Sequence, residues 1–149
     1  MILGLLLATA SVQPVTLVYS GDRLGKVEPC GCPKNPMGHI ARHVLYLDER
    51  RAKDPELIAF DLGNYFFEAL SIEEELREQQ ARRAAILSRS LERLKLDFIV
   101  PGPTDFAAGF AGYKRLVERS KTLVLAADLF TPSGEPAFAS HRVFERKNK

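Results

Sequence analysis

The sequence predicts an α/β fold in which strands alternate with helices around a mostly parallel sheet. Short runs rich in β-branched and aromatic residues alternate with longer segments that carry apolar residues at helical spacing. A helix between two strands favours parallel pairing through a crossover connection. The chain has 149 residues, of which 46% are hydrophobic and 27% charged, and this matches one globular domain in size and composition.

The predicted elements follow one another without an internal repeat or an interdomain linker. We expect strands over 15–20, 57–62, 97–100 and 122–126. We expect helices over 40–52, 71–96 and 106–120. The second helix should begin at a capping box formed by Ser71 and Glu74. The continuous apolar run 57–62 is typical of a strand that is covered on both faces.

Charge and the first ten residues restrict the partners and the location. The net charge of +2 lacks the strongly basic balance of a nucleic-acid-binding protein, so we expect no nucleic-acid polymer as a partner. Residues 1–10, MILGLLLATA, are typical of a signal peptide, and a buried first strand or helix is the alternative. The run is too short for a stable membrane span, which needs roughly 20 residues. Its cleavage would indicate an exported, periplasmic or extracellular protein.

Side chains with oxygen atoms follow every predicted strand. In open α/β sheets, ligands bind beyond the carboxyl ends of the strands, where carboxylate and amide oxygens could hold a divalent cation. The same residue types are also favoured in turns and at helix N-caps, which remains the alternative for each of them. The residues in question are Asp22, Asp61, Asn64, Thr104, Asp105 and Asp128.

The loop over 21–38 contains both cysteines, Cys30 and Cys32, and His39 follows directly. Two thiolates and an imidazole are suited to a single soft metal ion such as zinc or copper. Two other interpretations remain open: a strained, easily reduced disulfide with redox activity, and a structural loop with two free thiols. His43 lies one helical turn further along, and we expect it to be solvated.

Four segments, in chain order, resemble the motifs of the calcineurin-like metallophosphoesterases, and most closely those of the exported 5'-nucleotidases. They are YSGDRLG at 19–25, GHIAR at 38–42, DLGN at 61–64 and GPTDFAAG at 102–109. The segment EPCGC at 28–32 further resembles a subgroup of that superfamily. The resemblance implies the first half of a four-layer α/β/β/α sandwich, as a single domain over 15–149.

The resemblance also implies a metal-dependent phosphoester hydrolase that acts on a small-molecule phosphate ester through two divalent ions such as Mn or Zn. Asp22 matches a metal ligand, and Asn64 stands where the family has the aspartate that bridges the two ions. Leu24 stands at the position of the histidine ligand, and Pro103 at that of the asparagine ligand. Thr104 stands at the position of the catalytic histidine, and Ala107 at that of the aspartate that orients it.

These departures predict a degenerate metal site. We therefore expect the chain by itself to be inactive or impaired as a phosphoesterase. In the family a second half supplies further histidine ligands, whereas this sequence stops at Lys149. We expect either a truncated copy or a subunit that a partner chain or self-association completes. The alternative function is a metal-binding or redox-active module that uses Cys30, Cys32 and His39.

Overall fold

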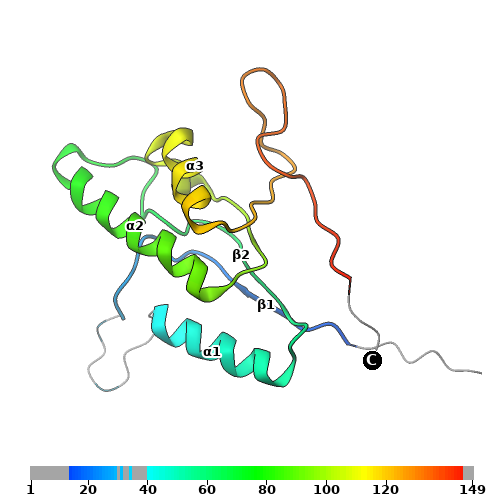
Figure 1. Ribbon diagram of the computed structural model, residues 1–149. Coiled ribbons are helices and arrows are strands. Elements are labelled where there is room, and N and C mark those ends of the chain that lie inside the picture. The colour runs from blue at the N-terminus through cyan, green and yellow to red at the C-terminus, as the bar shows by residue number, and fades with distance from the viewer. Residues whose placement is uncertain (1–13, 30, 32–33, 35–39, 146–149) are drawn as a thin grey trace, which may run out of the picture.

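The computed structural model describes residues 14–29, 31, 34 and 40–145 (Figure 1). Strands alternate with helices along the chain, which confirms the predicted α/β class. Two 3₁₀ turns, η1 (Glu74–Leu76) and η2 (Pro103–Phe106), precede the second and third helices. The strands and helices are β1 (Leu17–Ser20), α1 (Ile40–Lys53), β2 (Ile58–Asp61), α2 (Arg77–Leu94), β3 (Phe98–Ile99) and α3 (Gly109–Ser120).

The three strands form one parallel sheet in the order β1-β2-β3. In the register, Ser20 lies opposite Asp61, and Asp61 lies opposite Ile99. Because the strands are parallel and in this register, their carboxyl ends lie at one edge of the sheet. The loops that follow β1, β2 and β3 therefore meet at that edge.

The predicted fourth strand over 122–126 is wrong as a strand. This segment makes only isolated bridges within the described part of the chain, from Val124 to Ile99 and from Leu125 to Ala139. In the first bridge, Ile99 N donates to Leu123 O and Leu125 N donates to Ile99 O. The next residue, Ala126, donates from its backbone N–H to Ala139 O instead. Because the segment changes partner after one bridge, no ladder develops beside β3.

Two predicted helix starts are also wrong. Glu74 begins η1 instead of standing in the first turn of a helix capped by Ser71, and neither η1 nor α2 has a side-chain cap. The predicted helix over 106–120 begins later, at Gly109, because Phe106 is the last residue of η2. Gly109 has a φ of +74°, which a continuous helix does not allow, so the two helical pieces remain separate.

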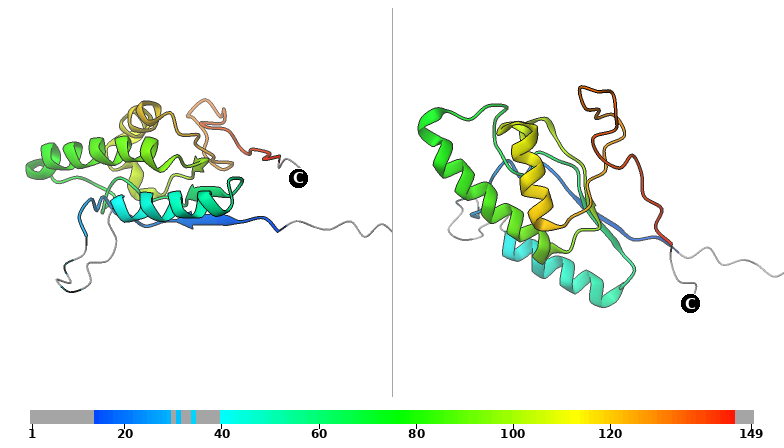
Figure 2. Two further views of the ribbon diagram at one scale, coloured as in Figure 1. Left: turned by 60° about the horizontal axis from the view of Figure 1, so that its bottom comes forward. Right: turned by 45° about the horizontal axis from the view of Figure 1, so that its top comes forward.

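All three helices lie on one face of the sheet, as Figures 1 and 2 show. Ala59, Asp61 and Ile99 point to this covered face and are almost fully buried. The apolar side chains of the helices pack against them and form the core, with the buried residues Leu47, Ala84, Leu87, Leu91, Leu94, Tyr113 and Val117.

The opposite face of the sheet carries a row of aromatic rings. Tyr19, Phe60 and Phe98 are neighbours across the three strands, with ring centroids 6.0 Å and 4.7 Å apart, and Phe144 extends the row. Tyr19 is 68% exposed. The prediction that the run 57–62 is covered on both faces is therefore wrong for the described residues, because only the helical face is covered.

Candidate functional site

Asp22, Asn64 and Thr104 come together at the carboxyl edge of the sheet, each from a different loop. The side-chain amide of Asn64 donates from Nδ2 to Oδ1 of Asp22 over 2.8 Å. Oδ1 of Asn64 accepts two hydrogen bonds of 3.1 Å, from the backbone N–H and the hydroxyl of Thr104. We call these three residues the strand-end cluster. Its polar side chains are hydrogen-bonded mainly to one another.

The orientation of the Asn64 amide follows from its partners. A backbone N–H can only donate, so the Asn64 atom that faces Thr104 N must be the carbonyl oxygen. The NH₂ group then faces Asp22, where it meets a carboxylate that accepts. The only side-chain oxygen that Asn64 could offer to a metal ion is therefore already bonded to Thr104.

The backbone of the cluster is held in an uncommon conformation. Asp22, Leu24 and Asn64 have φ values of +51°, +53° and +54°, in the left-handed region that residues other than glycine rarely adopt. Hydrogen bonds from Asp22 N to Gly63 O (2.9 Å) and from Leu24 N to Asn64 O (2.7 Å) hold the first two loops together. Such conformations persist where the surroundings overdetermine them, which is common at functional sites.

Gly63 and Gly102 allow the second and third loops to approach one another. A β-carbon added at Gly102 would lie 2.3 Å from Asn64 Oδ1 and 2.4 Å from Asn64 N. A β-carbon at Gly63 would lie 2.5 Å from Gly102 N. Neither position has room for a side chain, so both glycines are needed to place Asn64 against Thr104.

Two further aspartates at this edge support the loops. Asp105 is 1% exposed and accepts hydrogen bonds from the backbone N–H groups of Tyr65 (2.7 Å), Phe66 (2.8 Å) and Gly102 (2.8 Å). Burial raises its pKa, and these hydrogen bonds hold part of the rise back. A carboxylate surrounded by backbone donors and shielded from solvent connects two loops and is not positioned to bind a ligand.

Asp61 has a similar supporting role on β2. It accepts hydrogen bonds from the Ser20 hydroxyl (2.6 Å) and from Gly63 N (2.9 Å). Burial raises its pKa, and the bonds from Ser20 and Gly63 oppose that rise. Of the predicted oxygen ligands, Asp128 is exposed in the bend after residue 126, and no hydrogen bond among the described residues joins it to the cluster.

The donor set of the strand-end cluster does not fit a two-metal centre. Leu24 has no donor atom, and Pro103 has none in its side chain. Asp22 supplies the one carboxylate, and a hydrogen bond from Asn64 already occupies one of its oxygens. Among the described residues no group of three or more His, Cys, Asp or Glu side chains could hold a metal ion. The ligand and catalytic positions that the resemblance implies, Thr104 and Ala107 included, remain predictions.

Several predictions concern residues outside the described part of the chain. Cys30, Cys32, His39 and the segment 1–10 all lie there, so the soft-metal or redox site and the signal peptide remain predictions. Within the described residues, no helix has the length and apolar character that crossing a membrane requires. The expected partner chain or self-association also remains a prediction.

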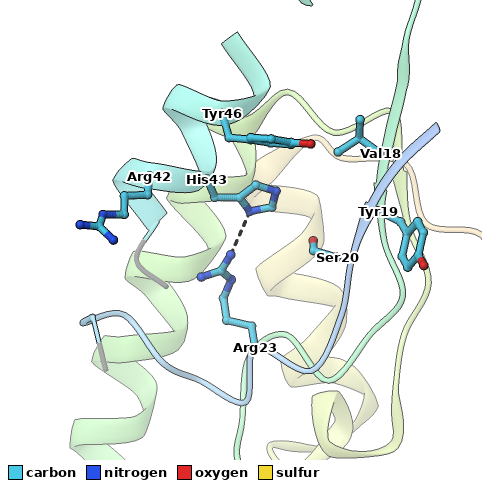
Figure 3. A pocket seen from close by; sticks show the side chains of 7 residues that line it. All are labelled: Val18, Tyr19, Ser20, Arg23, Arg42, His43 and Tyr46. Carbon is cyan, nitrogen blue, oxygen red and sulfur yellow. Dashed lines mark hydrogen bonds between the residues drawn. The ribbon is translucent and has the colours of Figure 1, made fainter. Parts of the chain in front are cut away.

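The expectation that His43 is solvated is wrong. His43 is half-buried, and its Nδ1 lies 3.0 Å from Nη2 of Arg23, which belongs to the loop after β1 (Figure 3). Arg23 also lies over the Tyr65 ring, with its guanidinium carbon 5.1 Å from the ring centroid. Helical spacing offered one signal, because His43 precedes the buried Leu47 by four residues. The Arg23 contact spans 20 residues and had no local signal.

Comparison with solved structures identifies the fold. The chain is similar to a 5'-nucleotidase precursor from Thermus thermophilus, with 23% identity, a TM-score of 0.61 and coverage of 76% of this chain and 22% of that one. It is similar to a calcineurin-like phosphoesterase from Bacillus subtilis, with 15% identity, a TM-score of 0.64 and coverage of 84% and 40%. It is also similar to the NAD nucleotidase of Haemophilus influenzae, with 15% identity, a TM-score of 0.71 and coverage of 89% and 24%.

The sequence by itself matches no protein-family model and no curated protein. The chain spans between 22% and 40% of the length of these three solved structures. The predicted resemblance is therefore confirmed at the level of the fold: this chain has the fold of one part of these calcineurin-like phosphoesterase and nucleotidase structures.

Proposed function

We propose that this chain is an exported metallophosphoesterase-like domain of the 5'-nucleotidase kind in which the two-metal hydrolytic site is impaired. Similarity to a 5'-nucleotidase and to a NAD nucleotidase supports a small-molecule phosphate ester as the ligand class. Export rests on the sequence of residues 1–10. N-terminal sequencing of the secreted or periplasmic protein tests that part, and an intact Met1 in the mature chain would contradict it.

The hydrogen bonds of the Asn64 amide are the observation that supports an impaired two-metal site. The Asn64 amide stands where the family has a bridging carboxylate, and it is bonded to Asp22 on one side and to Thr104 on the other. A bridging ligand must offer negative charge to two cations, whereas this amide donates from Nδ2 to the one carboxylate of the strand-end cluster, that of Asp22. A cation that approached Asp22 there would meet those N–H groups.

Hydrolysis assays test the proposal directly. The purified chain is assayed with p-nitrophenyl phosphate and with a nucleoside monophosphate, in the presence of manganese. Asp22→Ala removes the remaining carboxylate of the cluster, and Asp128→Ala is the matched control, because Asp128 is an exposed aspartate outside the cluster. We expect the wild type and both variants to show the same background rate. A manganese-dependent rate that Asp22→Ala abolishes and Asp128→Ala leaves intact would overturn the proposal.

Metal analysis gives a second measurement. Elemental analysis after dialysis against manganese or zinc should find no metal that depends on Asp22. Asn64→Asp places a second carboxylate beside Asp22, so we expect this variant to gain affinity for manganese relative to the wild type. Stoichiometric manganese in the wild type that disappears in Asp22→Ala would contradict the proposal. Zinc that disappears only in Cys30→Ser would instead report on the predicted cysteine site.

A further inference from the structure

A second polar site lies between the edge strand β1 and helix α1 (Figure 3). The pocket has a volume of about 390 Å³, which falls within the roughly 300–1,000 Å³ range of small-molecule sites. Among the described residues, its lining contains arginine, histidine and tyrosine side chains and no acidic side chain. The lining residues are Val18, Tyr19, Ser20, Arg23, Arg42, His43 and Tyr46.

Arg23 brings a cation with unused hydrogen-bonding capacity to this pocket. Its guanidinium donates to His43 through Nη2, and its face lies against Tyr65. Its Nε is buried and has no hydrogen-bond partner among the described residues. Arg23 also forms no ion pair with a described acidic side chain. A buried donor without a partner is rare in folded proteins and often indicates an acceptor that binds there.

His43 adds a donor of known position. An arginine side chain can only donate, so Nδ1 of His43 must accept from Arg23. The neutral ring then carries its proton on Nε2, which no described residue accepts. Burial, together with the Arg23 and Arg51 cations, lowers the pKa of His43 to about 4. The ring is therefore neutral at physiological pH, and the potential around it is positive.

The side chains converge in a way that suits a ligand with a polar end and an apolar body. Figure 3 shows His43 and Tyr46 projecting from α1 toward β1, and Arg23 reaching toward His43 from below. Tyr46 is 43% exposed, and Arg50 lies over its ring with the guanidinium carbon 5.0 Å from the centroid, so part of the ring offers an accessible apolar surface beside these donors. The Arg23 charge interacts with the Asp61 carboxylate and opposes the rise in pKa that burial causes there. Asp61 does not line the pocket, and it is hydrogen-bonded to Ser20 and Gly63.

We propose that this pocket binds a small organic oxyanion, either a carboxylate or a phosphate monoester, which accepts hydrogen bonds from Arg23 and from Nε2 of His43 and packs its apolar body against Tyr46. A guanidinium fork and an imidazole N–H are suited to oxyanions, and the bond to an ionised acceptor is strong. The site shares no residue with the strand-end cluster and does not rest on the function proposed above.

The test uses nuclear magnetic resonance titrations of the whole chain with benzoate, phenyl phosphate and benzamide, the uncharged analogue of benzoate. We expect saturable shifts of the Arg23 and His43 amide signals with one or both anions and none with benzamide. Binding of benzoate alone assigns a carboxylate, binding of phenyl phosphate alone assigns a phosphate monoester, and either supports the proposal. No saturable shift, equal binding of benzamide, or shifts centred on Asp22 and Asn64 would overturn it.

Variants locate the contacts. Arg23→Gln should weaken anion binding at least tenfold, and Arg115→Gln, an exposed arginine on α3, should leave it unchanged. Tyr46→Ala alters an exposed ring and should fold normally, so it keeps the test decisive if Arg23→Gln does not fold. Tyr46→Ala should weaken the binding of phenyl phosphate several-fold more than the binding of inorganic phosphate. Equal losses in Arg23→Gln and Arg115→Gln, or no effect of Tyr46→Ala, would contradict the assigned contacts.

Discussion

Asp22 and Arg23 are neighbours in the chain, yet their side chains belong to two polar regions that differ in one respect. In the strand-end cluster, the Asn64 amide has partners on both sides, in Asp22 and Thr104. In the pocket beside α1, Arg23 Nε and His43 Nε2 have no acceptor among the described residues. Satisfied groups stabilise a fold, whereas unsatisfied donors in a cavity indicate a place for a ligand.

The largest effect is expected where the strand-end cluster is most tightly packed. Gly102→Ala would place a β-carbon 2.3 Å from Asn64 Oδ1, so the second and third loops must separate. We expect a loss of about 3 kcal/mol or more in the free energy of unfolding, measured by urea denaturation. Gly31→Ala is the control, because no atom of the described residues lies within 4 Å of its added β-carbon. Equal effects of the two substitutions would show that the loops are not closely packed.

Asn64→Asp tests whether the cluster depends on the amide. The substitution replaces a donor 2.8 Å from Asp22 with a second carboxylate, and like charges at this distance repel. We expect a loss of about 2 kcal/mol in unfolding free energy at pH 7. The loss should shrink at acidic pH, where the two carboxylates share a proton. A loss that does not change with pH would mean that charge repulsion is not its cause.

The pocket beside α1 should respond to acid through His43. Its pKa falls from 6.5 to about 4 on folding, so the unfolded chain binds a proton between these values that the folded chain does not. Stability is therefore lost as the pH falls from 6.5 to 4, by about 1–2 kcal/mol after allowance for the exposed part of the ring.

The measurement is the melting temperature of the wild type and of His43→Gln across this range, relative to pH 7.5. Glutamine can still accept from Arg23 but does not titrate. We expect the variant to lose less stability than the wild type on acidification. Parallel pH profiles for the two proteins would rule out His43 as the titrating group.

The smallest effect is expected for Thr104→Val. This substitution removes the hydroxyl bond to Asn64 Oδ1 but keeps the backbone N–H bond to the same atom. We expect a loss of about 0.5–1 kcal/mol in unfolding free energy, and a smaller loss for Thr104→Ser, which keeps the hydroxyl. A loss for Thr104→Ser as large as that for Thr104→Val would contradict the prediction, because serine keeps the hydroxyl bond and lacks only the methyl group.

The meeting of Asp22, Asn64 and Thr104 could be predicted from the sequence, because each follows a short apolar run that ends at Gly or Pro. Parallel strands bring such positions to one edge whatever the details of packing. Within the run 57–62, strand β2 (Ile58–Asp61) buries one face only, which the composition of the run could not reveal. The aromatic ring of Phe60 is compatible with either a covered or an open face, and the surrounding elements determine which one occurs.

Local sequence is sufficient to establish the alternation of strands and helices and the lack of donor atoms at Leu24 and Pro103, since these depend on residue type and short-range periodicity. The direction of the Asn64 amide and the partner of His43 depend on contacts across 40 and 20 residues. Those contacts exist only after the sheet register and the packing of α1 have brought the loops together. The fold therefore determines which polar groups are satisfied and which remain free for a ligand.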